Sequence, residues 1–187
     1  MSQDKFIHTT PDDPLIVPII QGLFGEYKAR YADFFSNNQE VDPASLYAAP
    51  DGVFIVLLRD GQPIAMGAYK RYDENTAELK RIWTDATLRQ QGLAKKVVQE
   101  LERLAFEQGY NRVFLTTGFR QPEAVKLYLS QGYEPQFDIT LDREIFSKPP
   151  YDGRLRFLKP LSAIAASIEQ AVEENAVVNA LKEKAYD

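Results

Sequence analysis

The chain has 187 residues, 44% of them hydrophobic and 26% charged, a size and composition that fit one globular domain with a full core. Its formal net charge of -5 argues against a general nucleic-acid binder, because such proteins need a clustered positive surface to neutralise phosphates. The sequence has no cysteine and one histidine, which excludes disulfides, thiolate nucleophiles and cysteine zinc sites, so no metal site is expected.

The first 50 residues predict a strand, a helix and a loop. Residues 5–10 read as a short strand that carries His8, the single histidine, on the surface. From 15 to 35, apolar residues recur at helical spacing, and Pro18 can occupy the first turn, where its missing N–H costs little. Residues 36–50 are polar and predict a loop with a short helical turn.

The next stretch predicts three antiparallel strands. Two turn signals, Asp60-Gly61 and Asp73-Glu74-Asn75, separate runs of apolar and β-branched residues. Because short turns join consecutive strands, these strands should form an antiparallel meander. The predicted strands are 53–59, 63–72 and 76–84.

After the third strand, the spacing of apolar residues changes from that of strands to that of helices. A crossover helix ending at Gly109 should place the strand after it parallel to the strand before it. The expected elements are a helix over 93–108, a strand over 113–117, a helix over 122–130, strand segments beginning at 133 and covering 137–141, a strand over 154–159, and a helix from 160 to about 184.

The chain shows no domain boundary before residue 160. Residues 1–160 are therefore expected to form one domain and residues 161–187 a C-terminal helical extension. That extension either packs on its own domain or contributes to a homodimer interface. The N-terminus lacks the pattern of a signal peptide, and no apolar stretch approaches the roughly 20 residues that span a bilayer, which predicts a cytoplasmic protein with no membrane partner. The apolar residues at near-helical spacing in the extension are Leu161, Ile164, Ile168, Val172 and Leu181.

The most informative stretch joins the third meander strand to the following helix. From Glu78 to Ala94 it reads Glu-Leu-Lys-Arg-Ile-Trp-Thr-Asp-Ala-Thr-Leu-Arg-Gln-Gln-Gly-Leu-Ala. A polar loop and a helix that opens at a glycine present unpaired N–H groups and a partial positive charge to an anion. Gly92 lets the backbone approach phosphates closely, and Lys95 adds positive charge. Taken alone, the same pattern also fits an ordinary helix start after a strand.

Three segments carry a family resemblance. Residues 89–94, Arg-Gln-Gln-Gly-Leu-Ala, resemble the acetyl-CoA signature Arg/Gln-x-x-Gly-x-Gly/Ala of the GNAT superfamily of N-acetyltransferases, and residues 78–84 resemble its fourth strand. Residues 121–133 resemble its second signature, Asn-x-x-Ala-x-x-Leu-Tyr-x-x-x-Gly-Phe/Tyr, with Gln121 in place of the usual Asn. The resemblance covers residues 53–141. It implies an α/β (α+β) fold, with a central mixed, mostly antiparallel sheet of about six or seven strands flanked by helices.

The resemblance also implies a binding mode for acetyl-CoA as cosubstrate, with no metal. In this family, the pantetheine arm lies between the fourth and fifth strands and pairs with backbone, and the loop amides bind the pyrophosphate. Arg89 either pairs with a phosphate or only holds the loop, and Trp83 can instead be a packing aromatic. The implied contact residues are Ile82, Trp83, Thr84, Arg89, Gln90, Gln91, Gly92, Leu93, Ala94, Lys95 and Gln121.

Two residues match the family's catalytic groups. An alkyl ammonium has a pKa of about 10.4, so a base must take its proton before the nitrogen can attack a thioester. Glu78 matches the general base; the alternative is a surface carboxylate or an ion-pair partner of Lys80 or Arg71. Tyr128 matches the general acid that protonates the departing thiolate, and the alternative is a core residue.

The resemblance implies an N-acetyltransferase in which a primary amine of a small molecule or peptide attacks acetyl-CoA directly in a ternary complex. The alternative is a non-catalytic acyl-CoA sensor or regulatory partner on the same fold. In this family, the first helix and the connection between the sixth and seventh strands build the acceptor site. The residues expected to line it, or else to pack as helix and loop surfaces, are Glu26, Tyr27, Arg30, Tyr31, Tyr151 and Asp152.

Overall fold

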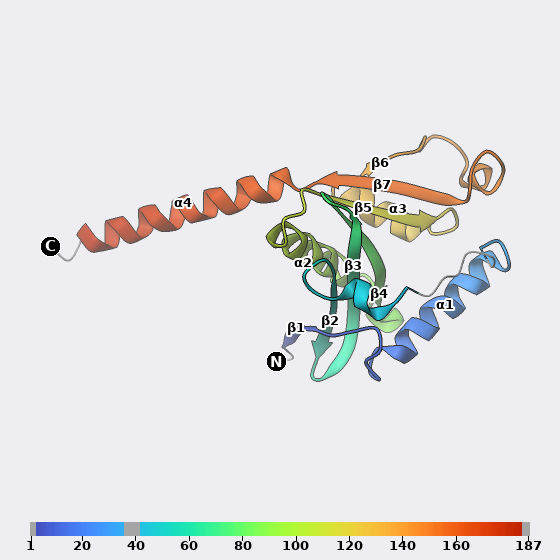
Figure 1. Ribbon diagram of the computed structural model, residues 1–187, viewed down its shortest axis with the longest axis horizontal. Coiled ribbons are helices and arrows are strands. Elements are labelled where there is room, and N and C mark those ends of the chain that lie inside the picture. The colour runs from blue at the N-terminus through green and yellow to red at the C-terminus, as the bar shows by residue number, and fades with distance from the viewer. Residues whose placement is uncertain (1–2, 36–41, 185–187) are drawn as a thin grey trace.

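The computed structural model describes residues 3–35 and 42–184, apart from the side chains of residues 163–168. One seven-stranded sheet forms its centre, with the strand order β1-β2-β3-β4-β5-β7-β6 (Figure 1). All neighbouring strands are antiparallel except β4 and β5, which are parallel, so the expected sheet and crossover are confirmed. The strands are β1 (Asp4–His8), β2 (Val53–Arg59), β3 (Gln62–Asp73), β4 (Thr76–Thr84), β5 (Arg112–Gly118), β6 (Glu134–Pro135) and β7 (Arg154–Pro160).

Four α-helices and three short 3-10 helices connect or flank the strands in the described ranges. The first α-helix has its proline in the first turn as predicted, but it ends at Tyr31 instead of Phe35, because Ala32 leaves the helical conformation with a φ of 47°. The α-helices are α1 (Val17–Tyr31), α2 (Leu93–Glu107), α3 (Pro122–Ser130) and α4 (Ser162–Lys184). The 3-10 helices are η2 (Ala44–Tyr47), η3 (Ala86–Leu88) and η4 (Arg143–Ser147). The predicted loop over 36–50 is described from Asp42 onward, and its residues 36–41 lie outside the described ranges.

Hydrophobic clusters cover both faces of the sheet. On one face, the apolar side of α2 packs on alternate residues of β2, such as Ile55 and Leu57. On the other face, the first half of α1 and η2 pack on the intervening residues Phe54 and Val56. The alternation follows from the period of two along a strand. The second half of α1 reaches the first cluster through Tyr31, whose hydroxyl donates to Gln121 just after β5. The helix α1 therefore begins over the second cluster, which includes Trp83 of β4, and ends near the end of β5.

Residues 137–141 do not form the predicted strand. β6 contains only Glu134 and Pro135, and one further backbone hydrogen bond to β7 runs from the Gln136 N–H to the Arg156 carbonyl at 2.8 Å. Asp138 then closes a turn by accepting hydrogen bonds from the Thr140 N–H and hydroxyl at 2.9 and 2.6 Å. The apolar side chain that suggested a strand, Phe137, is used in packing against Phe157 and its neighbours.

The C-terminal helix α4 projects away from the rest of the molecule (Figure 1). Its residues from 169 to 184 are exposed, and Val172 and Leu181 are 61% and 63% accessible. The two expected arrangements, packing on its own domain and a homodimer interface, both stay predictions. The side chains of Ile164 and Ile168 and the last three residues lie outside the described part. No helix within the described ranges is long and apolar enough to cross a membrane.

Candidate active site

The sheet opens between β4 and β5. The two strands pair only where Thr76 to Glu78 lie beside Arg112 to Phe114. Beyond this point, β4 continues to Thr84 beside β3, and β5 continues to Gly118 beside β7, with no ladder joining these two described strands. The facing edges therefore offer backbone N–H and C=O groups with which an extended ligand can pair.

A β-bulge distorts β4 next to this opening. Met66 lies opposite Trp83 and Ala68 opposite Lys80, so β4 uses one more residue than β3 over this interval. Arg81, inside the bulge, has a φ of 58°. A non-glycine residue in this left-handed region costs roughly 1–2 kcal/mol, and such strain concentrates at functional sites. The bulge bends the strand and redirects its side chains.

The loop between β4 and α2 presents a run of free backbone donors. Within the described ranges, no backbone N–H from Arg89 to Lys95 donates a hydrogen bond to a protein acceptor. The first such bond in α2 runs from the N–H of Lys96 to the carbonyl of Gly92, at 3.1 Å. Gly92 caps the helix without a side chain. These donors, together with the partial positive charge of the helix N-terminus, suit a phosphate or diphosphate.

The backbone shape of this loop depends on two left-handed residues. Gly92 has a φ of 73° and Gln90 a φ of 69°. A Cβ atom on Gly92 would meet no atom within 4 Å, so glycine is favoured there by conformation and not by a packed neighbour. Asp85 fixes the start of the loop, because it accepts a hydrogen bond from the Thr87 N–H at 2.8 Å. The two left-handed residues and Asp85 thus fix the backbone path of the loop, and no protein atom lies within 4 Å of a Cβ added at Gly92.

The side chains of this loop lie mostly at the surface. Arg89 pairs with Glu26 of α1 at 3.7 Å, and both side chains are more than half exposed, so the pair is weak and can exchange for a phosphate. Lys95 is exposed on the first turn of α2. The predicted contact residues that are exposed or half-buried here are Arg89, Gln90, Gln91, Gly92, Ala94 and Lys95, whereas Leu93 is buried.

At the end of β4, the predicted residues use their side chains for packing. Ile82 lies close to Gly67 on the α2 side of the sheet, and Trp83 packs on the cluster beneath α1. The packing role considered for Trp83 therefore holds for its side chain. The hydroxyl of Thr84 is buried without a hydrogen-bond partner in the described ranges, and such orphaned groups are rare in proteins. Cofactor contact by these three residues stays a prediction.

Tyr128 lies on α3 and is 6% exposed. Its ring packs against Tyr133 and Phe157, with centroids at 5.6 and 5.8 Å. Burial raises the pKa of the Tyr128 hydroxyl, so it stays protonated at neutral pH. Among the described residues, that hydroxyl has no hydrogen-bond partner. The ring is thus part of the core, as one reading of the sequence expected, while the hydroxyl keeps the protonated state that a general acid needs.

Gln121 ties the end of β5 to α1. Its side-chain oxygen accepts hydrogen bonds from the Gly118 N–H at 2.9 Å and from the Tyr31 hydroxyl at 3.2 Å. The Tyr31 oxygen in turn accepts a hydrogen bond from the Arg120 N–H at 3.0 Å. This network engages the oxygen of Gln121 and leaves its amide nitrogen for the predicted pantetheine contact.

Glu78 belongs to a half-buried charged cluster on the face beneath η2. Its carboxylate, 12% exposed, lies 3.5 Å from the Lys80 ammonium, so the ion pair considered from the sequence is present. Beside them, Asp42 accepts hydrogen bonds from the Tyr47 hydroxyl at 2.7 Å and from Lys70 at 3.2 Å. Burial would raise the pKa of Asp42, but these two donors and the Lys80 charge outweigh it, and the pKa is lowered. The role of Glu78 as a general base stays a prediction.

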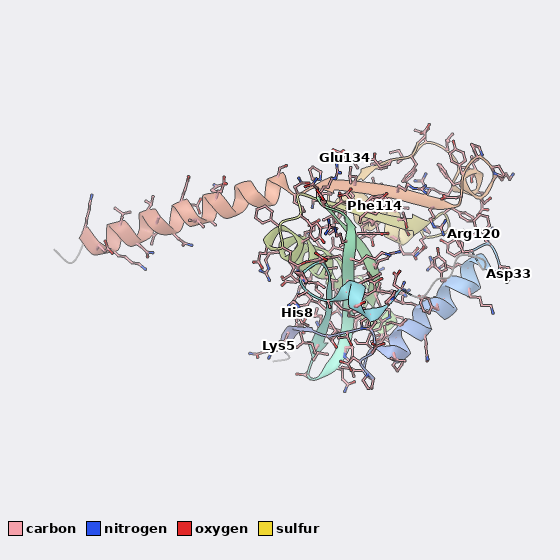
Figure 2. The ribbon with its side chains drawn as sticks, viewed as in Figure 1. Lys5, His8, Asp33, Phe114, Arg120 and Glu134 are labelled. Atoms are coloured by element: carbon pink, nitrogen blue, oxygen red, sulfur yellow. The ribbon has the colours of Figure 1, made fainter. Side chains whose placement is uncertain are left out.

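The expected acceptor residues on α1 are mostly joined to other groups. The rings of Tyr27 and Tyr31 lie in an aromatic cluster, with centroids 4.7 Å apart and planes tilted by 51°. Arg30 forms an ion pair with Glu123 of α3. The guanidinium of Arg120 donates to the Arg30 carbonyl at 3.0 Å. Figure 2 shows that Arg120 lies where α1 ends, away from His8 on β1. The end of α1 is thereby fixed over the end of β5.

The expected acceptor residues between η4 and β7 are also engaged. Asp152 accepts from Arg156 at 2.8 Å and pairs with Arg154 at 3.6 Å. The Tyr151 ring lies 4.9 Å from that of Phe146, at the surface.

The exposed position of His8 on β1 agrees with the sequence prediction. Within residues 3–35 and 42–184, no group of three histidine, aspartate or glutamate side chains is arranged to hold a metal ion.

Sequence reasoning found Lys80 as the ion-pair partner of Glu78 but missed the neighbouring residues Asp42 and Tyr47 and the bulge at Arg81. Asp42 and Tyr47 come from a segment that reads as an uninformative loop, and only the fold brings them to β4. No local signal marks a bulge inside a run such as Leu79 to Thr84. The consecutive charged residues Lys80 and Arg81, unusual in a central strand, were the one available hint.

Comparisons with known proteins agree with this geometry. In sequence, the chain is 32% identical to N-acetylaspartate synthetase of Danio rerio over 105 residues, which cover 55% of this chain and 37% of that protein. It is 38% identical to N-acetyltransferase 8 of Homo sapiens over 61 residues, covering 33% and 27%. The matched part thus spans about a third of each curated relative or less.

Solved structures show the same fold. An acetyltransferase of the GNAT family from Staphylococcus aureus superposes with a TM-score of 0.63 at 17% identity, covering 85% of this chain and 99% of that one. N-acetylglutamate synthase from Neisseria gonorrhoeae, complexed with coenzyme A and N-acetyl-glutamate, gives 0.58 at 15% identity, covering 86% and 36%. The model of the Acetyltransferase (GNAT) family matches residues 23–133, more than half of the chain. With that match, the resemblance seen in the sequence is confirmed: the chain belongs to the acetyltransferase (GNAT) family.

Proposed function

We propose that this protein transfers the acetyl group of acetyl-CoA to a primary amine of a small molecule or peptide, by direct attack in a ternary complex. The observation that carries the proposal is the run of free N–H groups from Arg89 to Lys95 beside the open edge of β4. A diphosphate and an extended amide-containing arm are the two parts of coenzyme A that such a site suits.

The residues present fit the cofactor. The backbone from Gln90 to Lys95 would hold the pyrophosphate, with Arg89 released from Glu26 to pair with a phosphate oxygen. The edge of β4 from Ile82 to Thr84 would hold the pantetheine arm, which would give the orphaned Thr84 hydroxyl a partner. When bound, acetyl-CoA supplies an acetyl group activated as a thioester.

Glu78 and Tyr128 would manage the protons of the transfer. Glu78 takes one proton from the substrate ammonium, and the neutral nitrogen then forms the C–N bond while the C–S bond breaks. Tyr128 gives its hydroxyl proton to the departing sulfur, and the second proton lost by the nitrogen restores Tyr128. The reaction therefore yields an amide and a thiol and releases one proton. A backbone N–H of β4 would stabilise the charge that develops on the carbonyl oxygen.

The test is an assay of thiol release from acetyl-CoA with a panel of amino acids, polyamines, aminoglycosides and peptides, with the product identified by mass spectrometry. We expect at least one amine to gain 42 Da as about one thiol is released per acetyl group, the stoichiometry that direct transfer requires. If the protein binds acetyl-CoA in calorimetry but releases no thiol with any amine, the non-catalytic acyl-CoA sensor is the better account. Absence of acetyl-CoA binding would contradict both functions.

The names of the relatives describe the substrates of those proteins. The acceptor amine of this chain has to be identified by the amine panel. The exposed helix α4 supports the further proposal of a homodimer, which sedimentation equilibrium tests. A cytoplasmic location is likewise proposed, and cell fractionation tests it.

A further inference from the structure

The guanidinium of Arg81 is a half-buried cation on the acceptor side of the opening. It lies 4.9 Å from the centroid of the Phe24 ring on α1. Its charge also acts on the Tyr47 hydroxyl of η2, as does the opposite charge of Glu78. Arg81 therefore lies between α1 and η2, and the same tyrosine has Arg81 and the expected base Glu78 as neighbours.

This cation has no carboxylate partner among the described residues. Lys70 pairs with Asp42 at 3.2 Å and Lys80 pairs with Glu78 at 3.5 Å. Among the described residues, three cations thus face two carboxylates on this face of β3 and β4, and Arg81 is the cation without a carboxylate.

A half-buried, unmatched guanidinium calls for an anionic partner, because burying a charge without one is unfavourable. Its planar fork of N–H donors matches a carboxylate in two parallel hydrogen bonds. The left-handed backbone at Arg81 is held by the bulge, which redirects this side chain relative to a regular strand. Glu78 and Arg81 lie three positions apart on β4, and the charges of both act on the Tyr47 hydroxyl, so together they suit a molecule that carries an amine and a carboxylate.

We propose that the acceptor is an amino acid or a similar carboxylate-bearing amine, whose carboxylate binds Arg81 while its amine faces Glu78. This inference rests on the proposed acetyl transfer and adds the substrate class. Arg81 is an acceptor-binding residue in this account and takes no part in proton transfer.

The experiment compares L-aspartate, L-glutamate and L-phenylalanine with their α-amides as acceptors, using thiol release from acetyl-CoA. The amide removes one carboxylate charge and leaves the amine and side chain in place. For the wild-type chain, we expect kcat/KM to be at least tenfold higher for one or more of the acids than for the matching amide, since hydrogen bonds between charged groups are strong.

Arg81→Asn is the main variant, because asparagine tolerates a left-handed backbone better than most residues and carries no charge. It should raise the KM for the preferred acid by roughly 10- to 100-fold. The KM for the matching amide and the KM for acetyl-CoA should stay unchanged. Arg81→Lys keeps the charge but lacks the planar fork of N–H donors. Its KM for the preferred acid should lie between those of the wild type and of Arg81→Asn. The matched control is Arg71→Gln on the exposed end of β3, which should behave as wild type.

Calorimetric binding of acetyl-CoA by each variant separates loss of fold from loss of acceptor recognition. Equal use of acids and amides by the wild type, or an unchanged acid preference in Arg81→Asn, overturns the inference and leaves acetyl transfer standing. No thiol release with any amine would instead remove the proposed function, and this inference with it.

Discussion

Tyr128 allows a test at the scale of a single hydroxyl. Because burial raises its pKa, the group stays protonated between about pH 6 and 9, and activity should not fall in that range through loss of this proton. Tyr128→Phe should lower kcat by about 100-fold or more, the usual loss for a general acid, with little change in the KM for acetyl-CoA. The matched control is Tyr72→Phe, an exposed tyrosine on β3. Normal kcat in Tyr128→Phe would leave the residue with only its packing role.

Gly92 tests the shape of the cofactor loop. Gly92→Ala would add a Cβ that meets nothing, so its cost is the left-handed backbone, about 1 kcal/mol or more. If that strain distorts the donor loop, the Kd for coenzyme A should rise by roughly tenfold. Gly109→Ala has the same open surroundings and a φ of 99° at the far end of α2. It should lose similar stability but bind coenzyme A normally, and equal binding by both variants would argue against a role for the loop.

How far the sequence predicts single residues depends on whether their role is local. The left-handed glycine before α2 could be predicted, because a helix that opens at a glycine after a polar loop is a local pattern. The unmatched charge of Arg81 could not, since it depends on α1 and η2 packing over a bulge in β4. The use of Gln121 to hold Tyr31 depends likewise on residues distant in sequence.

At the scale of elements, a buried ion pair joins α2 to β7. Glu102, 2% exposed, lies 3.0 Å from the Lys159 ammonium and accepts a hydrogen bond from the Tyr133 hydroxyl at 2.9 Å. Glu102→Ala removes one partner and leaves the others poorly satisfied, so we expect a loss of about 3 kcal/mol in the free energy of unfolding. Glu107→Ala, which breaks an exposed pair with Arg103 on the same helix, should cost less than about 1 kcal/mol. Urea denaturation of both variants measures the difference.

Asp42 links the η2 segment to β3 in a pH-dependent way. Its pKa is lowered in the folded state, so its contribution to stability is present above its ordinary pKa and is lost as the pH falls through the lowered value. The stability difference between wild type and Asp42→Asn should therefore be largest near pH 6 and shrink toward pH 3. Chemical denaturation across this range measures it, and a difference that grows on acidification would contradict the assigned ion pair.

Most elements were predictable because their apolar residues follow a clear period, as in α2 and in the meander of β2, β3 and β4. The segment 137–141 misled because its apolar residues, such as Phe137, alternate as in a strand. After Gln136, which still donates to the Arg156 carbonyl of β7, the aspartate at 138 accepts from the local backbone and closes a turn. Alternation over so few residues does not separate a strand from a loop that packs some of its side chains, here Phe137 and Leu141, against the core.

For the whole molecule, the domain should be independent of the exposed surface of α4. Replacing Val172, Val177 and Leu181 together with glutamate should change the stability by less than about 0.5 kcal/mol per site and leave acetyl-CoA affinity unchanged, because these side chains are exposed. If the predicted homodimer uses this helix, the same variant should lower the mass found by sedimentation equilibrium. A large loss of thermal stability without a change in mass would show that α4 packs on its own domain after all.

The central claim is that backbone groups between β4 and α2 hold the coenzyme. A crystal structure of the protein with coenzyme A tests it most directly. We predict diphosphate oxygens about 2.7–3.2 Å from the backbone nitrogens of Gln90 to Lys95, with the pantetheine arm lying along β4 in the opening beside β5. Coenzyme A bound elsewhere, with those nitrogens engaged inside the protein, would contradict the account.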